Sequence, residues 1–531
     1  MAEFTGSAAP SPQTLGDVSR AHRAARGGAV AFSFEDREVT FAEFDVHANR
    51  VANGLIAAGI GKGEHVAYLG KNSDSYFELF FGAARMGAIT TPVNWRLAKA
   101  EMLYILRDCD ARALFVGPEF AEFAAQLVEA LPALKLMVAM ESGQPGWPLY
   151  AAWRDAQPAQ DPPIEVSPDD VALQIYTSGT AGFPKGAMLS HRGLLDRIRH
   201  HSDRIPEWDD WGPDDVSLIA MPVFHISGSG WALVNFFFGA KGAIAREFNT
   251  AHVFDFIQQQ RITKLFMVVA AMQIMARDPR ARETDFSCLK HMYYGASPIP
   301  VPVLRECMAV FGCGFVQLYG MTETSGMIAA LSPEDHDADG SPHMAAAGKV
   351  LPGVELAIVD AEGKRLPPCQ MGEIVTRSAG NMVGYWNLPD ATAKAFDAER
   401  WFRTGDLAYL DEDGYLYIQD RVKDMIISGG ENIYPTEVEN LLCGHPDIAE
   451  AAVIGVPDPK WGEVVKAIVV PKPGRTPAAE HIIAFARQNI ASYKAPKSVD
   501  FAERLPRTSS GKILRRELRE PYWVQVGRRV N

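Results

Sequence analysis

The chain lacks the sequence signatures of several common protein classes. Its six cysteines form no C-x-x-C pair, which argues against a zinc or disulfide framework and favours thiols in a reducing, cytoplasmic compartment. The first residues show no basic stretch followed by an apolar core, so we expect no secretory signal. The longest apolar runs, near 231–240 and 265–276, are too short to span a bilayer, so no transmembrane segment is expected.

The chain also lacks a net positive charge and the sequence motif of a serine nucleophile. The 52 Lys and Arg are outnumbered by 65 Asp and Glu, and the net charge of −13 argues against a nucleic-acid partner. Local cations can still bind ATP or CoA. No G-x-S-x-G string is present, so we expect no acyl-enzyme on serine. The sequence leaves peripheral membrane contact and assembly as a homodimer open.

What is present predicts a globular α/β protein. With 531 residues, 47% of them hydrophobic, the chain is long enough for more than one domain. The capping-box spacing of Thr40 and Glu43 predicts the start of a helix. Residues 65–69 and 88–92 are predicted strands on either side of a helix at 73–86. Such alternation is typical of a βαβ unit in a parallel sheet.

The pattern of elements changes twice toward the C-terminus. From about residue 345, short strands with tight turns predict a small β-rich subdomain. Beyond a second boundary near 420–423, strands and helices alternate over about a hundred residues, as expected for a second, smaller domain. We therefore predict a large domain of layered α/β subdomains plus the β-rich subdomain over 1–420. A small, mobile α+β domain follows over 421–531.

A glycine- and hydroxyl-rich stretch follows a predicted strand at 171–176. From 176 to 186 it is Y-T-S-G-T-A-G-F-P-K-G, and its glycines allow backbone N–H groups to converge on one point. It is not a Walker A loop, because no Gly-Lys-Ser/Thr ends it. A surface loop is the alternative, but the whole string favours binding of a polyphosphate. The candidate ligands are Thr177, Ser178, Gly179, Thr180 and Lys185.

This stretch resembles the phosphate loop of the adenylate-forming superfamily: acyl-CoA synthetases, peptide adenylation domains and beetle luciferases. Similar strings follow in that superfamily's order between residues 40 and 516. One departure is Ala181, where the superfamily usually has Thr. The resemblance implies that ATP activates a carboxylic acid as an acyl-adenylate. The acyl group then passes to CoA, and AMP and pyrophosphate are released.

The resemblance also implies nucleotide-binding residues. Y-G-M-T-E at 319–323 is similar to the superfamily's nucleotide motif, in which Tyr319 would stack on adenine and Thr322 would contact the α-phosphate. Glu323 would hold Mg²⁺, a hard cation commonly bound by one carboxylate plus substrate phosphates. Gly295 and Ala296 would line the adenine.

A second set of residues is implied for the ribose. W-F-R-T-G-D at 401–406 resembles the ribose motif, with Asp406 accepting hydrogen bonds from the ribose hydroxyls. Arg421 lies in a string similar to the superfamily's hinge and would also contact the ribose.

The predicted small domain would supply two further elements. Lys423 is implied as the pivot of a domain rotation, and Gly429 and Gly430 would leave room for the pantetheine of CoA. Lys512, in P-R-T-S-S-G-K, is implied as the catalytic lysine. The attack of a carboxylate on a phosphate joins two anions, and Lys512 and Mg²⁺ would offset that repulsion.

The segment that begins at 221 with M-P-V-F-H-I-S-G is the candidate acyl pocket. It contains no charged side chain before Lys241 apart from the imidazole of His225. Relatives that activate amino acids usually have Asp at the position of His225, so an amino-acid substrate is disfavoured. Small residues at 227–230 are expected to leave space. The predicted wall comprises His225, which we also include among the catalytic residues, with Ile226, Ser227, Gly228 and Trp231.

This reasoning favours an apolar acid, with a medium- or long-chain fatty acid first. An aryl or arylpropenoic acid is the alternative, as is a stand-alone adenylation enzyme that loads a separate carrier protein. Oxygenation of the luciferase type ranks below both. A non-enzymatic binding module is disfavoured, because the acidic and basic residues that the chemistry needs are all present.

Overall fold

The computed structural model describes residues 12–142, 144–177, 184–203, 209–297, 299–337, 340–421, 424–428, 431–458, 460–508 and 511–523. Several predicted site residues therefore lie outside the described residues: Ser178, Gly179, Thr180, Lys423, Gly429 and Gly430. Arg421 is described as the last residue of its strand.

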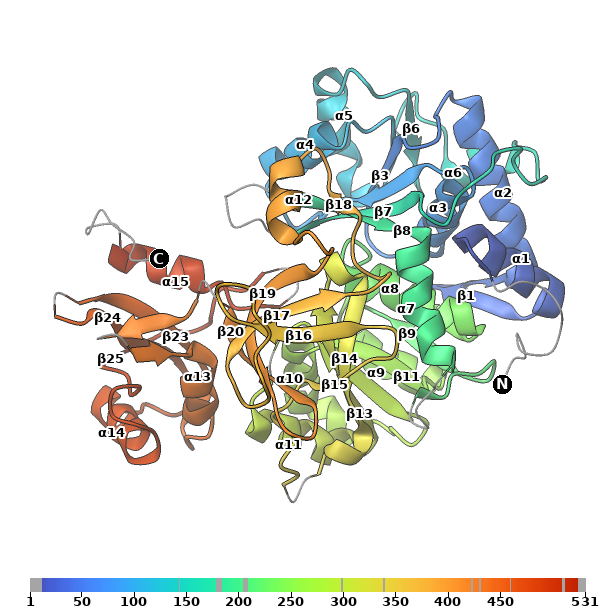
Figure 1. The fold of residues 1–531 in the computed structure, drawn as a ribbon. Coiled ribbons are helices and arrows are strands. Elements are labelled where there is room, and N and C mark those ends of the chain that lie inside the picture. Colours follow the sequence, from blue (N-terminus) through green and yellow to red (C-terminus); the bar gives the residue numbers. More distant parts are fainter. Residues whose placement is uncertain are drawn as a thin grey trace.

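Two sheets build the large N-terminal part of the molecule (Figure 1). Within the described residues, one sheet contains, in spatial order, β18 (Gly384–Tyr385), β8 (Lys185–Ser190), β7 (Val171–Thr177), β4 (Ile89–Pro92), β3 (His65–Leu69), β5 (Ala113–Val116) and β6 (Leu136–Ala139). The larger sheet contains β16 (Glu355–Val359), β17 (Gly372–Arg377), β19 (Phe402–Leu410), β20 (Tyr415–Arg421), β15 (Gly348–Val350), β14 (Gly326–Leu331), β13 (Gly314–Met321), β12 (His291–Gly295), β11 (Lys264–Val268), β9 (Val216–Ile219), β10 (Lys241–Ile244), β1 (Val30–Phe34) and β2 (Arg37–Thr40).

Helices cover these sheets. They are α1 (Leu15–Arg26), α2 (Phe41–Ala57), α3 (Asp74–Arg85), α4 (Lys99–Asp108), α5 (Ala121–Leu127), α6 (Tyr150–Asp155), α7 (His191–Asp203), α8 (Ile226–Phe238), α9 (Thr250–Gln259), α10 (Val269–Arg277), α11 (Val301–Phe311) and α12 (Pro389–Ala395). Among the described residues, no helix combines the length and the apolar character needed to cross a bilayer.

The first βαβ unit forms as predicted. The Thr40 hydroxyl accepts from the Glu43 N–H at 3.2 Å, and the Glu43 carboxylate accepts from the Thr40 N–H at 2.9 Å, which satisfies two helix N-terminal donors. Phe41, Phe44 and Val51 on the inner face of α2 are fully buried. The strands β3 and β4 pair in parallel, with His65 opposite Ile89 at the start of the register. The predicted parallel α/β layer is therefore confirmed.

The β-rich region after residue 345 is antiparallel and continues the larger sheet. Strand β13 runs parallel to β12, whereas β14 returns antiparallel to β13 and pairs with β15. From there, β20, β19, β17 and β16 follow in antiparallel order. The register of the β13–β14 pair shifts between Tyr319 and Gly320, and a Cβ at Gly320 would lie 1.9 Å from the carbonyl oxygen of Gly326. Only glycine fits at such a close backbone approach.

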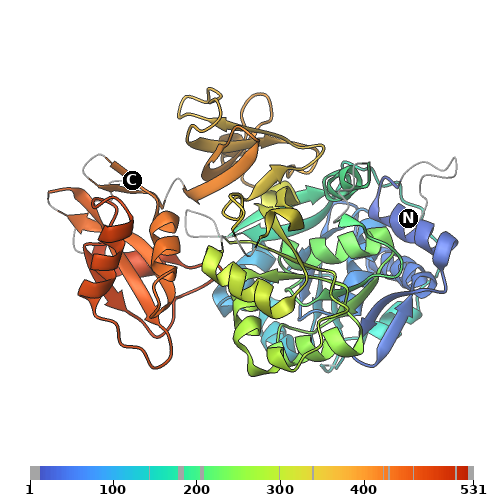
Figure 2. The same ribbon diagram turned by 90° about the horizontal axis from the view of Figure 1, so that it is seen from below.

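The C-terminal elements form a lobe set apart from the rest, coloured red in Figure 2. Its sheet contains β22 (Glu431–Ile433), β21 (Ile426–Ser428), β24 (Gly462–Pro471), β23 (Ile448–Asp458) and β25 (Ser498–Phe501). Its helices are α13 (Pro435–Cys443), α14 (Ala479–Asn489) and α15 (Arg515–Trp523). This lobe has hydrophobic clusters of its own, built around residues such as Ile433, Val453 and Ile482. The molecule thus has a large N-terminal and a small C-terminal domain, and the boundary at 421 stays a prediction.

Candidate active site

The two ends of the predicted phosphate loop meet beside Glu323. Thr177 ends β7 and Lys185 begins β8, and the two residues are direct partners in the antiparallel pair. Glu323 lies in a short 3-10 helix that follows β13. The Thr177 hydroxyl donates to Glu323 Oε1 at 3.0 Å. The structure thus brings together Thr177, Lys185, Glu323 and its neighbour Thr322, which are far apart in the chain.

Tyr385 joins this cluster, and it was not predicted from the sequence. Its hydroxyl donates to Glu323 Oε1 at 3.0 Å, and the Lys185 ammonium lies 4.8 Å from the centroid of its ring. A single tyrosine after a glycine in G-Y-W carries no pattern that indicates a role. Only the pairing of β18 with β8 places it at the site.

The carboxylate of Glu323 fits a role in holding Mg²⁺. In the described part of the chain, both hydroxyl donors reach Oε1, which leaves Oε2 for a cation. No group of three or more His, Cys, Asp or Glu among the described residues is placed to hold a metal ion by itself. One carboxylate completed by nucleotide phosphates and water is the usual arrangement for Mg²⁺.

Predicted ribose and adenine residues also contact one another, although they come from separate strands of the larger sheet. The Tyr319 hydroxyl on β13 donates to Asp406 Oδ2 on β19 at 2.7 Å. Asp406 is 5% exposed, and its backbone N–H donates to the Thr404 hydroxyl at 3.1 Å. Arg421 is the direct strand partner of Asp406 across the β19–β20 pair. Asp406 therefore lies beside two other predicted nucleotide residues, Tyr319 by a hydrogen bond and Arg421 by strand pairing.

The turn after β12 has little room and an unusual backbone. A Cβ at Gly295 would lie 2.2 Å from the carbonyl oxygen of Leu318, so a side chain there would force the strands apart. Ala296 has a φ of 68°, in the left-handed region that L residues rarely adopt. Strained backbone of this kind persists where the surrounding structure holds it, and it clusters at binding sites. The role of Gly295 and Ala296 in lining the adenine stays a prediction.

Lys512 lies in a loop that is held together by its own hydrogen bonds. The Lys512 N–H donates to the Thr508 hydroxyl at 3.0 Å, and the Arg507 guanidinium donates to the Gly511 carbonyl at 2.8 Å. The loop lies close to the large domain, because a Cβ at Gly511 would lie 3.5 Å from side-chain atoms of Val268 and Ala270. This domain arrangement points the predicted catalytic lysine loop at the end of β11.

His225 precedes α8 and lies within the electrostatic influence of Lys512. Burial, together with the positive charges of Arg96 and Lys512, lowers the pKa of His225 to about 3. The imidazole is therefore neutral at pH 7, and the ring packs edge-on against Phe224, with centroids 4.6 Å apart. Arg96 was not identified from the sequence as a residue near the site. Its place just beyond the carboxyl end of β4, where α/β proteins bind ligands, is a signal that could have indicated it.

The acyl-pocket prediction needs one correction. A Cβ at Gly228 would lie 2.2 Å from the Pro222 carbonyl oxygen, so Gly228 permits tight backbone packing and does not leave space. The neighbouring Ser229 is also buried, with its hydroxyl 2.7 Å from that of Tyr76. Trp231 packs against Tyr293 in the core, with centroids 4.9 Å apart. Its place in the pocket stays a prediction, as does that of Ser227.

Ile226, at the start of α8, lies beside two glycines, Gly230 and Gly326. Among the described residues, a Cβ at Gly230 would meet only the Ile226 side chain, at 3.1 Å. A Cβ at Gly326 on β14 would likewise meet only Ile226, at 3.9 Å. The apolar side chain of Ile226 is therefore the nearest described neighbour of a glycine on α8 and of a glycine on β14.

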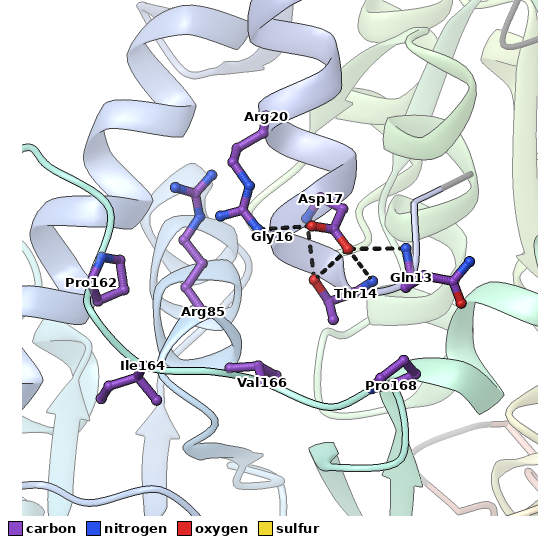
Figure 3. A pocket seen from close by; sticks show the side chains of 10 residues that line it. All are labelled: Gln13, Thr14, Gly16, Asp17, Arg20, Arg85, Pro162, Ile164, Val166 and Pro168. Atoms are coloured by element: carbon purple, nitrogen blue, oxygen red, sulfur yellow. Dashed lines mark hydrogen bonds and ion pairs between the residues drawn. The ribbon is translucent and has the colours of Figure 1, made fainter. Parts of the chain in front are cut away.

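A separate cavity of about 270 Å³ lies beside α1, between Arg20, Arg85 and the extended segment from Pro162 to Pro168 (Figure 3). Arg20 pairs with Asp17 at 2.8 Å, so charge within the cavity wall is already compensated. Its described lining contains none of the predicted site residues. The cavity belongs to the packing of the N-terminal helix and not to the candidate active site.

Comparison with known proteins agrees with this geometry. The model of the family described as AMP-binding enzyme matches residues 19–386, and the model of its C-terminal domain matches residues 437–512. The chain belongs to the AMP-binding enzyme family. It is an ATP-dependent acid–thiol ligase, of the group that acts on acyl and aryl acids.

Two curated relatives show the range of this AMP-binding family. Fatty acid–[acyl-carrier-protein] ligase ScoC of Streptomyces coeruleorubidus is 41% identical over 98% of this chain and 99% of its own length. Feruloyl-CoA synthase of an Amycolatopsis species is 39% identical over 91% of this chain and 94% of its own length. These names differ in both the acid and the thiol acceptor.

Two solved structures of one protein, with and without ATP, are similar to this chain. ATP-bound MatB of Rhodopseudomonas palustris superposes with a TM-score of 0.87, at 30% identity over 96% of this chain and 99% of MatB. The apo structure of MatB, over the same share of both chains, gives 0.78. The chain as a whole therefore superposes better on the ATP-bound structure of MatB than on the apo structure.

Proposed function

We propose that this AMP-binding enzyme activates an apolar carboxylic acid, a medium- or long-chain fatty acid first, and transfers the acyl group to CoA. The observation that carries the proposal is the apolar Ile226 beside Gly230 and Gly326, directly after a neutral His225 that the charge of Lys512 influences. An ionised or strongly polar acyl tail would lose its hydration there without gaining a partner. The acid would enter tail first, with its carboxylate toward Lys512.

In the first half-reaction a carboxylate oxygen attacks the α-phosphorus of ATP, and the bond to the bridging oxygen of the β-phosphate breaks. Lys512 would hold the attacking carboxylate and the α-phosphate together, since His225 carries no charge at pH 7. Thr177 and Lys185 would retain the departing pyrophosphate, and Thr322 would contact the α-phosphate. Bound Mg²⁺, held by Glu323, would supply neutralisation of the phosphate charge.

The nucleotide would stay in place for the second half-reaction. Asp406 would accept the ribose hydroxyls, while Tyr319 fixes that carboxylate and offers its ring to adenine. The thiol sulfur attacks the acyl carbon, its proton is lost, and AMP leaves. Gly429 and Gly430 would border the thiol's path, with rotation about Lys423.

The aryl acid and the carrier-protein acceptor are alternatives with specific support. Feruloyl-CoA synthase, by its name, acts on an aryl acid, and ScoC, by its name, loads a carrier protein. The apolar side chain of Ile226 can pack against an aromatic ring as readily as against an alkyl chain. The acid and the acceptor therefore have to be tested separately.

The decisive experiment measures pyrophosphate release and thioester formation with a panel of acids. The panel runs from hexanoate to palmitate and includes ferulate, with CoA, with a phosphopantetheinylated carrier protein, or with neither. We expect turnover with the fatty acids to exceed that with ferulate, and CoA to serve as acceptor. Release of ADP and phosphate would overturn the reaction type. If thioester forms only on the carrier protein, the acceptor is a carrier protein and not CoA.

The pocket assignment has its own test. Gly230→Leu adds a large apolar side chain beside Ile226 and should shorten the preferred acid, while the KM for ATP stays within about twofold. Gly212→Ala is the matched control, because a Cβ there meets no described atom within 4 Å. An unchanged chain-length profile in Gly230→Leu would remove this position from the pocket.

A further inference from the structure

Tyr385 connects the two sheets at the phosphate site. Its strand pairs with β8 of the smaller sheet, while its hydroxyl reaches Glu323, which follows β13 of the larger sheet. Its ring also lies under the Lys185 ammonium. One side chain therefore contacts the proposed metal-binding carboxylate and the cation of the phosphate loop.

The backbone around Tyr385 is held at both ends. The Met382 N–H donates to the Glu323 carbonyl at 2.8 Å, and the Trp386 N–H donates to the Gly186 carbonyl at 2.8 Å. The Tyr385 N–H itself donates to the Thr392 hydroxyl of α12 at 2.9 Å. These bonds fix residues 382–386 against both sheets, so the phenol is presented in one place.

We propose that Tyr385 is a positioning residue for the Mg²⁺–ATP site. Tyr385 and Thr177 both donate to Glu323 Oε1, and neither adds charge. Two neutral donors on one oxygen fix the rotation of the carboxylate and direct Oε2 toward the phosphates. The ring face also attracts the Lys185 ammonium, which keeps that cation near the phosphate loop. The inference rests on the proposed role of Glu323 in holding Mg²⁺.

The direct test uses Mn²⁺ as a paramagnetic substitute for Mg²⁺ and measures its binding to the full-length protein with a non-hydrolysable ATP analogue. Tyr385→Phe keeps the ring but removes the donor, and it should weaken Mn²⁺ binding about tenfold, the scale for one hydrogen bond to a charged group. Thr177→Val removes the other donor and should act in the same direction. Metal-free binding of the analogue to Tyr385→Phe should stay within about twofold.

Tyr415→Phe is the matched control. Its hydroxyl donates to Asp335 at 2.9 Å in the β-rich region, so it should not alter Mn²⁺ binding. Tyr385→Leu removes the ring as well and should additionally weaken metal-free binding of the analogue, because Lys185 loses its aromatic support. A general defect of folding would instead lower the melting temperature of Tyr385→Phe well below that of the control.

A double-mutant cycle with Glu323→Gln shows whether Tyr385 acts through Glu323. If it does, Tyr385→Phe should change Mn²⁺ binding by less than about twofold in the Glu323→Gln background. A tenfold effect in both backgrounds, or no effect in the wild-type background, would overturn the inference. If Glu323→Gln alone leaves Mn²⁺ binding unchanged, the proposed role of Glu323 fails instead, which separates the two failures.

Discussion

The two sides of the candidate active site are built in different ways. On the nucleotide side, Asp406, Tyr319 and Glu323 are held by hydrogen bonds that join separate strands of the large domain. On the opposite side, Lys512 comes from one loop of the small domain, whose hydrogen bonds include some within the loop and one from Arg507 to Glu450 of the same domain. At Gly511 that loop lies close to Val268 and Ala270 of the large domain.

This difference indicates which part is fixed and which can be exchanged. A hydrogen-bonded sheet edge keeps its side chains in place throughout a reaction, whereas a loop on a separately packed domain can be withdrawn without breaking that network. The small domain has its own hydrophobic clusters, so it can move as one body. We therefore expect changes on the Lys512 side to affect one half-reaction, and changes on the nucleotide side to affect both.

The largest expected effect is that of Lys512→Ala. Adenylation, measured by pyrophosphate exchange, should fall by about two to three orders of magnitude, the scale for one preorganised charge contact. Thioester formation from supplied acyl-adenylate should remain near wild type. Lys497→Ala, an exposed lysine of the same domain, is the control. Equal loss of both half-reactions would mean that the Lys512 loop is structural.

Asp406→Ala should weaken both half-reactions. Loss of the buried carboxylate removes the acceptor for the ribose and leaves the Tyr319 hydroxyl without its 2.7 Å partner. Affinity for ATP and for AMP, measured by calorimetry, should fall by on the order of tenfold to a hundredfold. A loss confined to one half-reaction would contradict the view of a fixed nucleotide side.

Gly228→Ala should destabilise the large domain. Its Cβ would lie 2.2 Å from the Pro222 carbonyl oxygen, and such overpacking costs about 1–3 kcal/mol of unfolding free energy. Gly212→Ala, which meets no described atom within 4 Å, should be neutral. Denaturant unfolding followed by tryptophan fluorescence measures both. Equal stability of the two variants would show that the turn before α8 can relax.

The smallest expected effect is a dependence of folding stability on pH, and it also arises in the large domain. Burial lowers the pKa of His191 to about 4, and its Nε2 has no hydrogen-bond partner among the described residues. Since the folded pKa lies below the unfolded value of about 6.5, the unfolded state binds the proton first. This contribution to the free energy of unfolding is therefore fully present above about pH 6.5 and is lost as the pH falls toward 4.

The variant His191→Asn tests this prediction. The asparagine side-chain oxygen can accept the Leu15 N–H, as Nδ1 of His191 does at 3.2 Å, but the asparagine does not titrate. Between pH 7 and pH 6 the wild type should lose about 0.7 kcal/mol more unfolding free energy than the variant. Chemical denaturation at the two pH values measures the difference. Parallel losses would show that His191 does not carry this part of the acid sensitivity.

The sequence by itself determined the local structure and the main chemistry. The capping box at Thr40 and the strand at 65–69 are where their patterns predicted them, because neighbouring residues suffice to satisfy helix ends and pleat a strand. The strings around Glu323, Asp406 and Lys512 indicated a family that the comparisons confirm. The roles of these residues stay predictions.

Only the tertiary structure decided which distant groups meet. Tyr385 reaches Glu323 because β18 crosses to the smaller sheet, and Lys512 influences His225 because the two domains dock. Gly228 is a second example. From the sequence alone, a glycine beside apolar residues could leave space for a ligand or allow another backbone segment to approach, and the structure shows the close backbone approach. Sequence patterns encode contacts between neighbours in the chain, whereas these contacts depend on how whole strands and domains pack.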